Sequence, residues 1–111
     1  MPRYAAAVDA NQSDIVAEFR ARGATVKHVH TVKKFVDIVV GYRGVNLLVE
    51  IKDGSKPPSE QKLTTGEQEF QDGWRGQVCI INDTSQVEPL LREIDQVVMV
   101  TPGGFAPIRG K

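Results

Sequence analysis

The sequence predicts a mixed α/β fold, in which a mixed sheet of α-β-β-β-α-β order is flanked by helices. Three observations predict it. Apolar residues at helical spacing follow Asn11, three runs rich in Val, Ile and Leu come next, and capping-box patterns at Thr64 and Ser85 open later helices. A chain of 111 residues suits one core, so we expect a single domain over residues 1–100. The Gly- and Pro-rich tail, 101–111, is expected to be loosely ordered.

The first half of the chain is expected to hold one helix and three strands. The helix runs from Asn11, its N-cap, through Arg22, and Gly23 ends it. The residues expected on its buried stripe are Ile15, Val16 and Phe19. The strands are expected at 25–32, 36–41 and 46–52, and a loop follows at 53–58 because of its Gly and Pro content.

The second half is expected to add two helices and two strands. Thr64 and Glu67 form a capping box for a helix whose Phe70 and Trp74 should join the core. The apolar run at 77–82 predicts a strand buried on both faces, with Cys79 as a small buried hydrophobe.

A short third helix should follow the 77–82 strand. Ser85 and Glu88 repeat the capping-box pattern there, and Pro89 is tolerated in a first turn. The residues at 96–100 predict a last strand at an edge of the sheet.

The segment VDIVVGYRGVNLLVEIK contains the most informative residues of the chain. A two-residue turn at Arg43 and Gly44 would pair position 42 with 45 and, farther out, Asp37 with Glu50. Lys52 lies two residues beyond Glu50 and would project from the same face. A type I turn with a glycine bulge is the alternative, because Arg disfavours positive φ, and it would shift the pairing by one residue. Two carboxylates buried together need compensation, which a divalent cation would provide.

Composition excludes several classes of protein. Net charge is zero, and no apolar run approaches the ~20 residues of a membrane span. The N-terminus lacks the apolar core of a signal peptide, and one cysteine allows no disulfide framework, so a cytoplasmic location is expected. Residues 1–62 hold ten Lys and Arg against seven Asp and Glu, and the segment 27–34 concentrates this basic excess. That segment is either a phosphate-binding edge or a solvated strand face.

The triad Asp37, Glu50 and Lys52, on consecutive strands after a helix, resembles the PD-(D/E)xK nuclease superfamily. The longer string VGYRGVNLLVEIKDGSKPPSEQKLTTGEQEFQDGWRGQV is similar to small phage and prophage nucleases of the VRR-NUC type, which are related to Holliday-junction resolvases. The resemblance covers roughly residues 8–90 and implies a restriction-endonuclease-like core. One departure is Val36, because the family often has Pro before the first Asp, and Lys33 and Lys34 stand where it often has glycines.

The resemblance implies a metal-dependent DNA endonuclease with roles in repair or recombination. Asp37, Glu50 and the Ile51 backbone carbonyl would hold Mg²⁺ or Mn²⁺, and Lys52 would orient the attacking water or stabilise charge on the phosphate. A polar residue of the first helix would assist a second metal, with Asp9 favoured over Gln12 and Asp14.

Further residues are candidates for contact with DNA or for support of the site. The candidates for binding DNA are Lys33, Lys34, Arg43 and Lys56. The candidates for supporting the site are Gln12, His30 and Gln68. His28 and His30 share a strand face, but no third ligand for a transition metal is evident. Each of these side chains also has a plain structural interpretation as a solvated surface group.

The resemblance to resolvases implies that the substrate is branched or otherwise structured DNA, cut by a homodimer that presents two sites. A DNA-binding module without turnover, or a regulatory domain that binds a protein, is the alternative. A protein partner would leave Asp37 and Glu50 without a metal. If the protein is phage or prophage encoded, the cytoplasm in which it is expected to act is that of a bacterial host cell.

Overall fold

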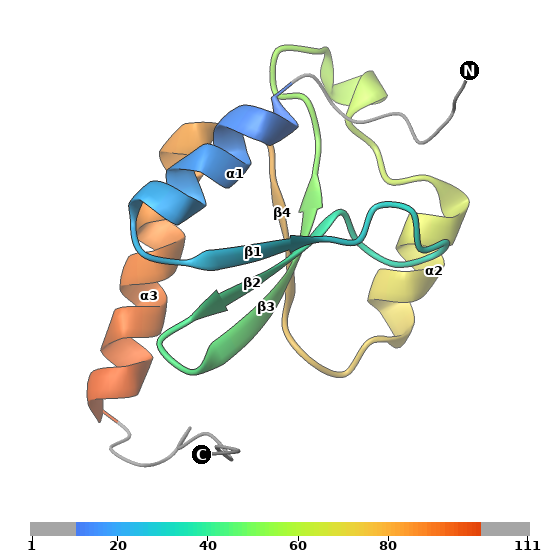
Figure 1. Cartoon of the computed structure of the whole chain (residues 1–111). Coiled ribbons are helices and arrows are strands. Elements are labelled where there is room, and N and C mark those ends of the chain that lie inside the picture. Colours follow the sequence, from blue (N-terminus) through green and yellow to red (C-terminus); the bar gives the residue numbers. More distant parts are fainter. Residues whose placement is uncertain (1–10, 101–111) are drawn as a thin grey trace.

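The computed structural model describes residues 11–100, which form a four-stranded mixed sheet with helices on both faces (Figure 1). The elements are α1 (Gln12–Ala21), β1 (Thr25–His28), β2 (Ile38–Tyr42), β3 (Val45–Ile51), the short 3-10 helix η1 (Pro58–Glu60), α2 (Thr65–Gly73), β4 (Val78–Ile81), the 3-10 helix η2 (Thr84–Gln86) and α3 (Val87–Val100). The strands lie in the order β1-β2-β3-β4. The first three are antiparallel, and β4 runs parallel to β3 after the α2 crossover. The mixed α/β class is confirmed.

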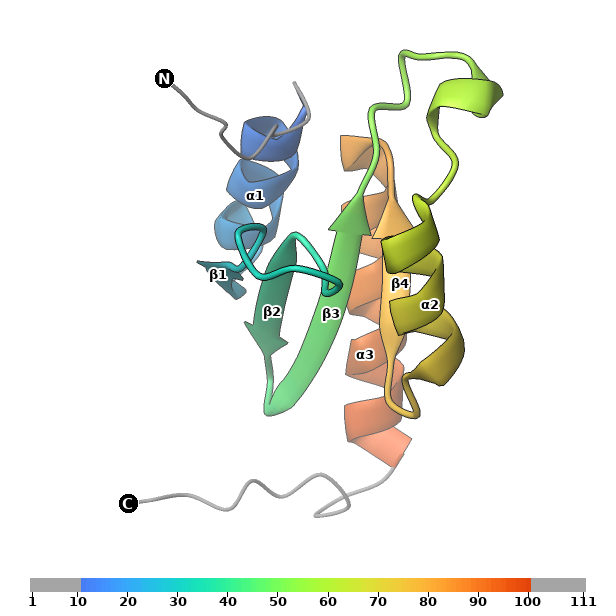
Figure 2. The same ribbon diagram turned by 90° about the vertical axis from the view of Figure 1, so that its right-hand side faces the viewer.

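Helices α1 and α3 cover one face of the sheet and α2 lies on the other (Figure 2). The core fills the α1 and α3 side, because alternate residues of β2 and β3 point there. Its buried members are Ile15, Val16, Phe19, Ala24, Ile38, Val40, Val45, Leu47, Val49, Ile51, Ile81, Val87, Leu91 and Ile94. Helix α2 has no buried residue. The α2 side of the sheet is therefore where polar groups gather.

The β2–β3 hairpin has the predicted two-residue turn. Tyr42 pairs with Val45 and Gly41 with Asn46, so no bulge shifts the register. Arg43 and Gly44 have φ of 52° and 85°, the two positive values that a type I′ turn requires. Arg43 accepts this conformation while its guanidinium pairs with Asp95 of α3 at 2.7 Å.

Two strand predictions are wrong in extent or type. Strand β1 ends at His28 instead of residue 32, because the chain turns back there and the Val32 N–H donates to the Val29 carbonyl. No strand occupies 96–100, since these residues complete α3. Its buried residues recur at helical spacing, and packing of that face outweighs the β preference of a Val-rich ending.

The burial expected for the 77–82 strand and for the aromatic residues of α2 is also wrong. Strand β4 lies at an edge of the sheet formed by the described residues, and Ile80 is exposed. Trp74 is exposed as well, and Phe70 is only partly buried, because no layer covers the outer side of α2. Cys79 is partly buried, and burial with the nearby Glu93 charge raises the pKa of its thiol to about 11.

Two helix caps differ from expectation. The Asn11 side chain makes no cap hydrogen bond and instead donates to the Lys52 and Asn82 carbonyls, each at 3.0 Å. The second box forms between Asp83 and Gln86 around η2, and α3 follows it. The Thr64 box of α2 is confirmed.

Within residues 11–100, no helix has both the length and the apolar character needed to cross a membrane.

Gly54 is required where the loop after β3 meets the end of β4. Its N–H donates to the Asn82 carbonyl at 3.1 Å, and a Cβ at this position would lie 2.4 Å from the same oxygen. We expect Gly54→Ala to lower the free energy of unfolding by about 1–3 kcal/mol, measured in urea. Gly73→Ala is the matched control, because a Cβ there meets no atom within 4 Å. It should leave stability unchanged or raise it by up to about 1 kcal/mol, and equal losses in both variants would contradict the proposed clash.

Candidate active site

Asp37 and Glu50 lie side by side at the open end of the β2–β3 hairpin. The Asp37 N–H donates to the Val49 carbonyl at 3.1 Å, which carries the pairing one step beyond β2. The Asp37 carboxylate accepts the Ile51 N–H at 2.7 Å and is held against β3. Glu50 lies between two core residues of β3 and therefore points to the α2 side, where it is 3% exposed. The predicted convergence of these carboxylates is present.

Glu50 is a carboxyl group in an unfavourable environment. Burial raises its pKa to about 9, and the neighbouring carboxylates of Asp37 and Glu67 add to that rise. Both neighbours also make hydrogen bonds that favour a protonated Glu50. In the absence of a cation, Glu50 is therefore neutral at physiological pH.

Lys52 provides the positive charge of this cluster. Its Nζ lies 3.8 Å from Glu50 Oε2 and 2.8 Å from Glu67 Oε1. Its side chain is 13% exposed, so these interactions are poorly screened by solvent. Lys52 thus joins Asp37 and Glu50 as expected, but its shorter contact is with α2.

Glu67 is the site residue that sequence reasoning missed. Its Oε1 accepts both the Lys52 Nζ and the Thr64 N–H at 2.8 Å, so one carboxylate closes the capping box and pairs with lysine. Burial acts to raise the pKa of Glu67, but the hydrogen bonds from Lys52 and Thr64 outweigh it and hold that pKa below its ordinary value. The capping-box pattern located Glu67 in the sequence without showing that the first turn of α2 lies over β3.

These groups open into a pocket of about 200 Å³ between the sheet, α2 and the loop that follows β1. Its lining residues are His30, Val32, Lys33, Lys34, Phe35, Val36, Asp37, Glu50, Thr64, Gly66 and Glu67. Three carboxylates therefore share the pocket with basic side chains of the 30–34 loop. Lys34 pairs with Glu69 at 3.2 Å, and both side chains are largely exposed.

The remaining predicted residues fall into two groups. His30, Lys33 and Lys34 line the pocket, as proposed for contacts near the site. Arg43 does not, because it lies at the hairpin tip, about 20 Å from Glu50 at ~3.3 Å per strand residue. Lys56 is exposed in the loop that follows β3, at the end of the strand where Glu50 lies.

The polar residues expected around the site differ in their placement. Gln12 is buried on α1, with Nε2 3.3 Å from His28 Nδ1, and His28 in turn packs edge-on against His30. Gln68 is exposed and donates to Asp72 along α2. Asp14 is exposed, and Asp9 lies outside the described residues.

The oxygen atoms of the pocket are of the type that a hard divalent cation binds. Across residues 11–100, no three His, Cys, Asp or Glu side chains form a ready metal-binding group. The pocket nevertheless offers carboxylate oxygens of Asp37 and Glu50. The N–H and C=O of a strand residue point to the same side, so the Ile51 carbonyl is directed toward Asp37, which accepts its N–H. Oxygen ligands of this type suit Mg²⁺ and Mn²⁺, and a cation would take over the role of the proton on Glu50.

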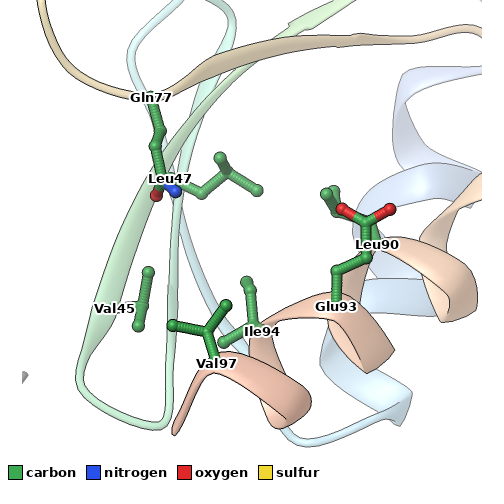
Figure 3. A pocket seen from close by; sticks show the side chains of 7 residues that line it. All are labelled: Val45, Leu47, Gln77, Leu90, Glu93, Ile94 and Val97. Atoms are coloured by element: carbon green, nitrogen blue, oxygen red, sulfur yellow. The ribbon is translucent and has the colours of Figure 1, made fainter. Parts of the chain in front are cut away.

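A second pocket, of about 100 Å³, lies on the α3 side of the sheet (Figure 3). Its lining residues are Val45, Leu47, Gln77, Leu90, Glu93, Ile94 and Val97. Glu93 is its single titratable group. Such a lining offers packing and no acid–base pair, so the candidate site is the pocket on the α2 side.

A scan against protein-family models gave no match, and searches of curated proteins and of solved structures gave none either. The proposed activity therefore depends on the geometry of the site and on the sequence resemblance.

The raised pKa of Glu50 predicts a pH-dependent stability. A folded pKa of about 9 against an ordinary 4.5 means that the folded state retains a proton that the unfolded state loses. In EDTA, the protein should lose stability as pH rises from about 5 to 9, with a limiting slope of about 1.4 kcal/mol per pH unit. Glu50→Gln removes this titration, so it should be increasingly more stable than wild type toward pH 9. Denaturant unfolding at pH 5, 7 and 8.5 tests this, with the exposed Glu88→Gln as control; parallel profiles for wild type and Glu50→Gln would refute it.

The Lys52–Glu67 pair should be energetically coupled. A double-mutant cycle with Lys52→Met and Glu67→Gln is informative because Gln preserves the capping box. We expect a coupling of about 1–3 kcal/mol, since the side chains are 13% and 24% exposed. The Arg92–Glu88 pair has the same 2.8 Å separation but is 57% and 45% exposed, and its coupling should not exceed about 0.5 kcal/mol. Equal couplings in the two cycles would show that burial does not strengthen the inner pair.

Proposed function

We propose that this protein is a metal-dependent endonuclease that hydrolyses DNA phosphodiester bonds. The observation that carries the proposal is that Asp37 and Glu50 line one pocket and that Lys52 contacts Glu50 beside it. Two carboxylates and a poorly solvated ammonium group are the combination that the PD-(D/E)xK resemblance implies. These residues lie far apart in the sequence, and the register of the β2–β3 hairpin brings them together.

The two carboxylates and the Ile51 carbonyl would hold Mg²⁺ or Mn²⁺. Such a cation, when bound, lowers the pKa of a water molecule and neutralises charge on a phosphate. Asp37 retains its hydrogen bond to the Ile51 N–H and so keeps a defined orientation. Glu50 would have to be deprotonated to act as a ligand, so affinity for the cation should rise with pH.

Lys52 would act on the reacting phosphate or on the attacking water. Glu67, which lines the pocket, holds the Lys52 Nζ by a 2.8 Å contact, so the ammonium group does not extend into solvent. A charged donor held in place stabilises developing negative charge without reorganisation. Lys33, Lys34 and His30 stand at the rim, where they would contact phosphates on either side of the scissile bond.

The preference for branched or structured DNA, and the homodimer that presents two sites, follow from the resemblance to resolvases. A symmetric pair of sites would cut two strands at related positions.

A nucleic-acid-binding module without turnover is the second candidate. It is favoured by one finding: no three metal-binding side chains in residues 11–100 are arranged as a ready site. Such a module would retain the basic rim and would bind DNA without cutting it.

Cleavage of labelled four-way junction, flap, linear duplex and single-stranded DNA distinguishes the candidates. We expect cutting with Mg²⁺ or Mn²⁺, none with EDTA, and a loss of at least about 100-fold in Lys52→Ala. Glu50→Gln should also fail to cut while remaining folded, because it keeps the neutral form but cannot bind the cation as a carboxylate. Lys62→Ala, an exposed lysine outside the pocket, is the matched control and should cut normally. DNA binding without cutting under every condition would favour the binding module.

A further inference from the structure

Three aromatic side chains form a continuous row that begins at the wall of the pocket. Phe35 lines the pocket and packs edge-on against Phe70 of α2, with ring centroids 5.3 Å apart. Phe70 then packs against Trp74 at 5.1 Å, with the two rings inclined by only 31°. The row therefore leads from the proposed cutting site to the end of α2.

Trp74 stands exposed at the end of this row and is held by its neighbours. It follows the last residue of α2 in extended conformation, with φ of −82° and ψ of 127°. Phe70 packs against its ring, and Gly76 lies so near that a Cβ there would be 2.8 Å from the indole Nε1. The residue is nevertheless 45% exposed. An indole with a restricted orientation and open surface is ready to stack against a ligand.

The fold leaves Trp74 on a face that no other layer of the described residues covers. The core lies on the other face of the sheet, and α2 contributes no buried residue to it. Exposed tryptophan beside a polar pocket is a feature of binding surfaces. Among the described residues, Phe70 and Gly76 lie close to the Trp74 indole.

The charges around the row suit a nucleic-acid strand. Lys33 and Lys34 stand at the pocket end, and the exposed Arg75 follows Trp74 in the chain. Of the acidic groups on α2, Glu69 pairs with Lys34 at 3.2 Å, whereas Asp72 accepts the Gln68 amide at 2.8 Å and keeps its charge. A strand passing the pocket would meet Lys33 at one end of the row, Arg75 at the other and aromatic rings between them.

We propose that Trp74, supported by Phe70, is a stacking platform for an unpaired nucleobase about three nucleotides from the scissile phosphate. This inference rests on the proposed function and names its substrate class: DNA that carries unpaired nucleotides near the cut. A base inside a duplex has both faces covered by its neighbours, whereas an unpaired base presents a face to the indole. The two ring-to-ring steps place Trp74 within about three stacked nucleotides of the pocket, at 3.4 Å per nucleotide.

The single tryptophan of the chain makes the platform directly observable by fluorescence. In EDTA, which prevents cutting, a ten-residue oligo-dT should quench Trp74, and a blunt duplex or an abasic strand of equal length should not. Trp74→Ala should bind labelled oligo-dT about 5- to 150-fold more weakly. Its affinity for the abasic strand should change less than twofold.

Two further variants control for folding and for exposed apolar surface. Trp74→Phe keeps an aromatic face and should bind oligo-dT within a few-fold of wild type. Ile80→Ala removes an apolar side chain from β4, where the residue is also 45% exposed, and should bind as wild type does. Circular dichroism establishes that each variant is folded.

The outcomes separate the platform from the nuclease activity. Equal oligo-dT affinity in wild type and Trp74→Ala, or equal quenching by the duplex, overturns the platform even if the wild type cuts DNA. Trp74-dependent binding in a protein that never cuts supports the platform and overturns the nuclease proposal. A wild type that binds none of the three probes overturns the platform.

Discussion

The register of the β2–β3 hairpin is the constraint on which the candidate site depends. Side chains alternate along a strand, so a slip of one residue would oppose Asp37 to a core-facing residue and separate the two carboxylates. Core residues of both strands, such as Val40 and Val49, resist that slip because it would expose them. The turn contributes from the other end, where Arg43 adopts positive φ while its side chain pairs with Asp95 of α3.

The site holds several charged groups that have little exposure to solvent. One lysine cannot compensate the charges of three carboxylates. The Lys52 Nζ lies 2.8 Å from Glu67 but is farther, at 3.8 Å, from Glu50. Burial is the largest cause of the raised pKa of Glu50, and the nearby carboxylates of Asp37 and Glu67 add to the rise, so the protonated form of Glu50 is favoured. Strongly perturbed carboxyl groups in pockets are common at functional sites, and a cation is the natural replacement for such a proton.

The backbone at the end of β3, next to the site, is anchored by a polar network that joins elements far apart in the sequence. The Asn11 amide bridges the carbonyls at the ends of β3 and β4, and Gly54 donates to the same Asn82 carbonyl. The Asn82 side chain in turn donates to Gln61 at 2.9 Å. The backbone that bears Lys52 is thereby fixed by α1, β4 and the following loop.

Local patterns in the sequence determined the fold class, the buried stripe of α1, the hairpin register and the association of Asp37, Glu50 and Lys52. Each depends on a short-range rule: helical spacing, the alternation of strand side chains, or the geometry of a two-residue turn. Tertiary packing decided the rest. The residues at 96–100 extend α3 because helical burial outweighs strand preference, Asn11 bonds two strand ends instead of capping its helix, and Trp74 stays exposed because no layer covers α2. Glu67 joins the site only because the α2 crossover carries its first turn over β3, a placement set by the packing of elements distant in the sequence.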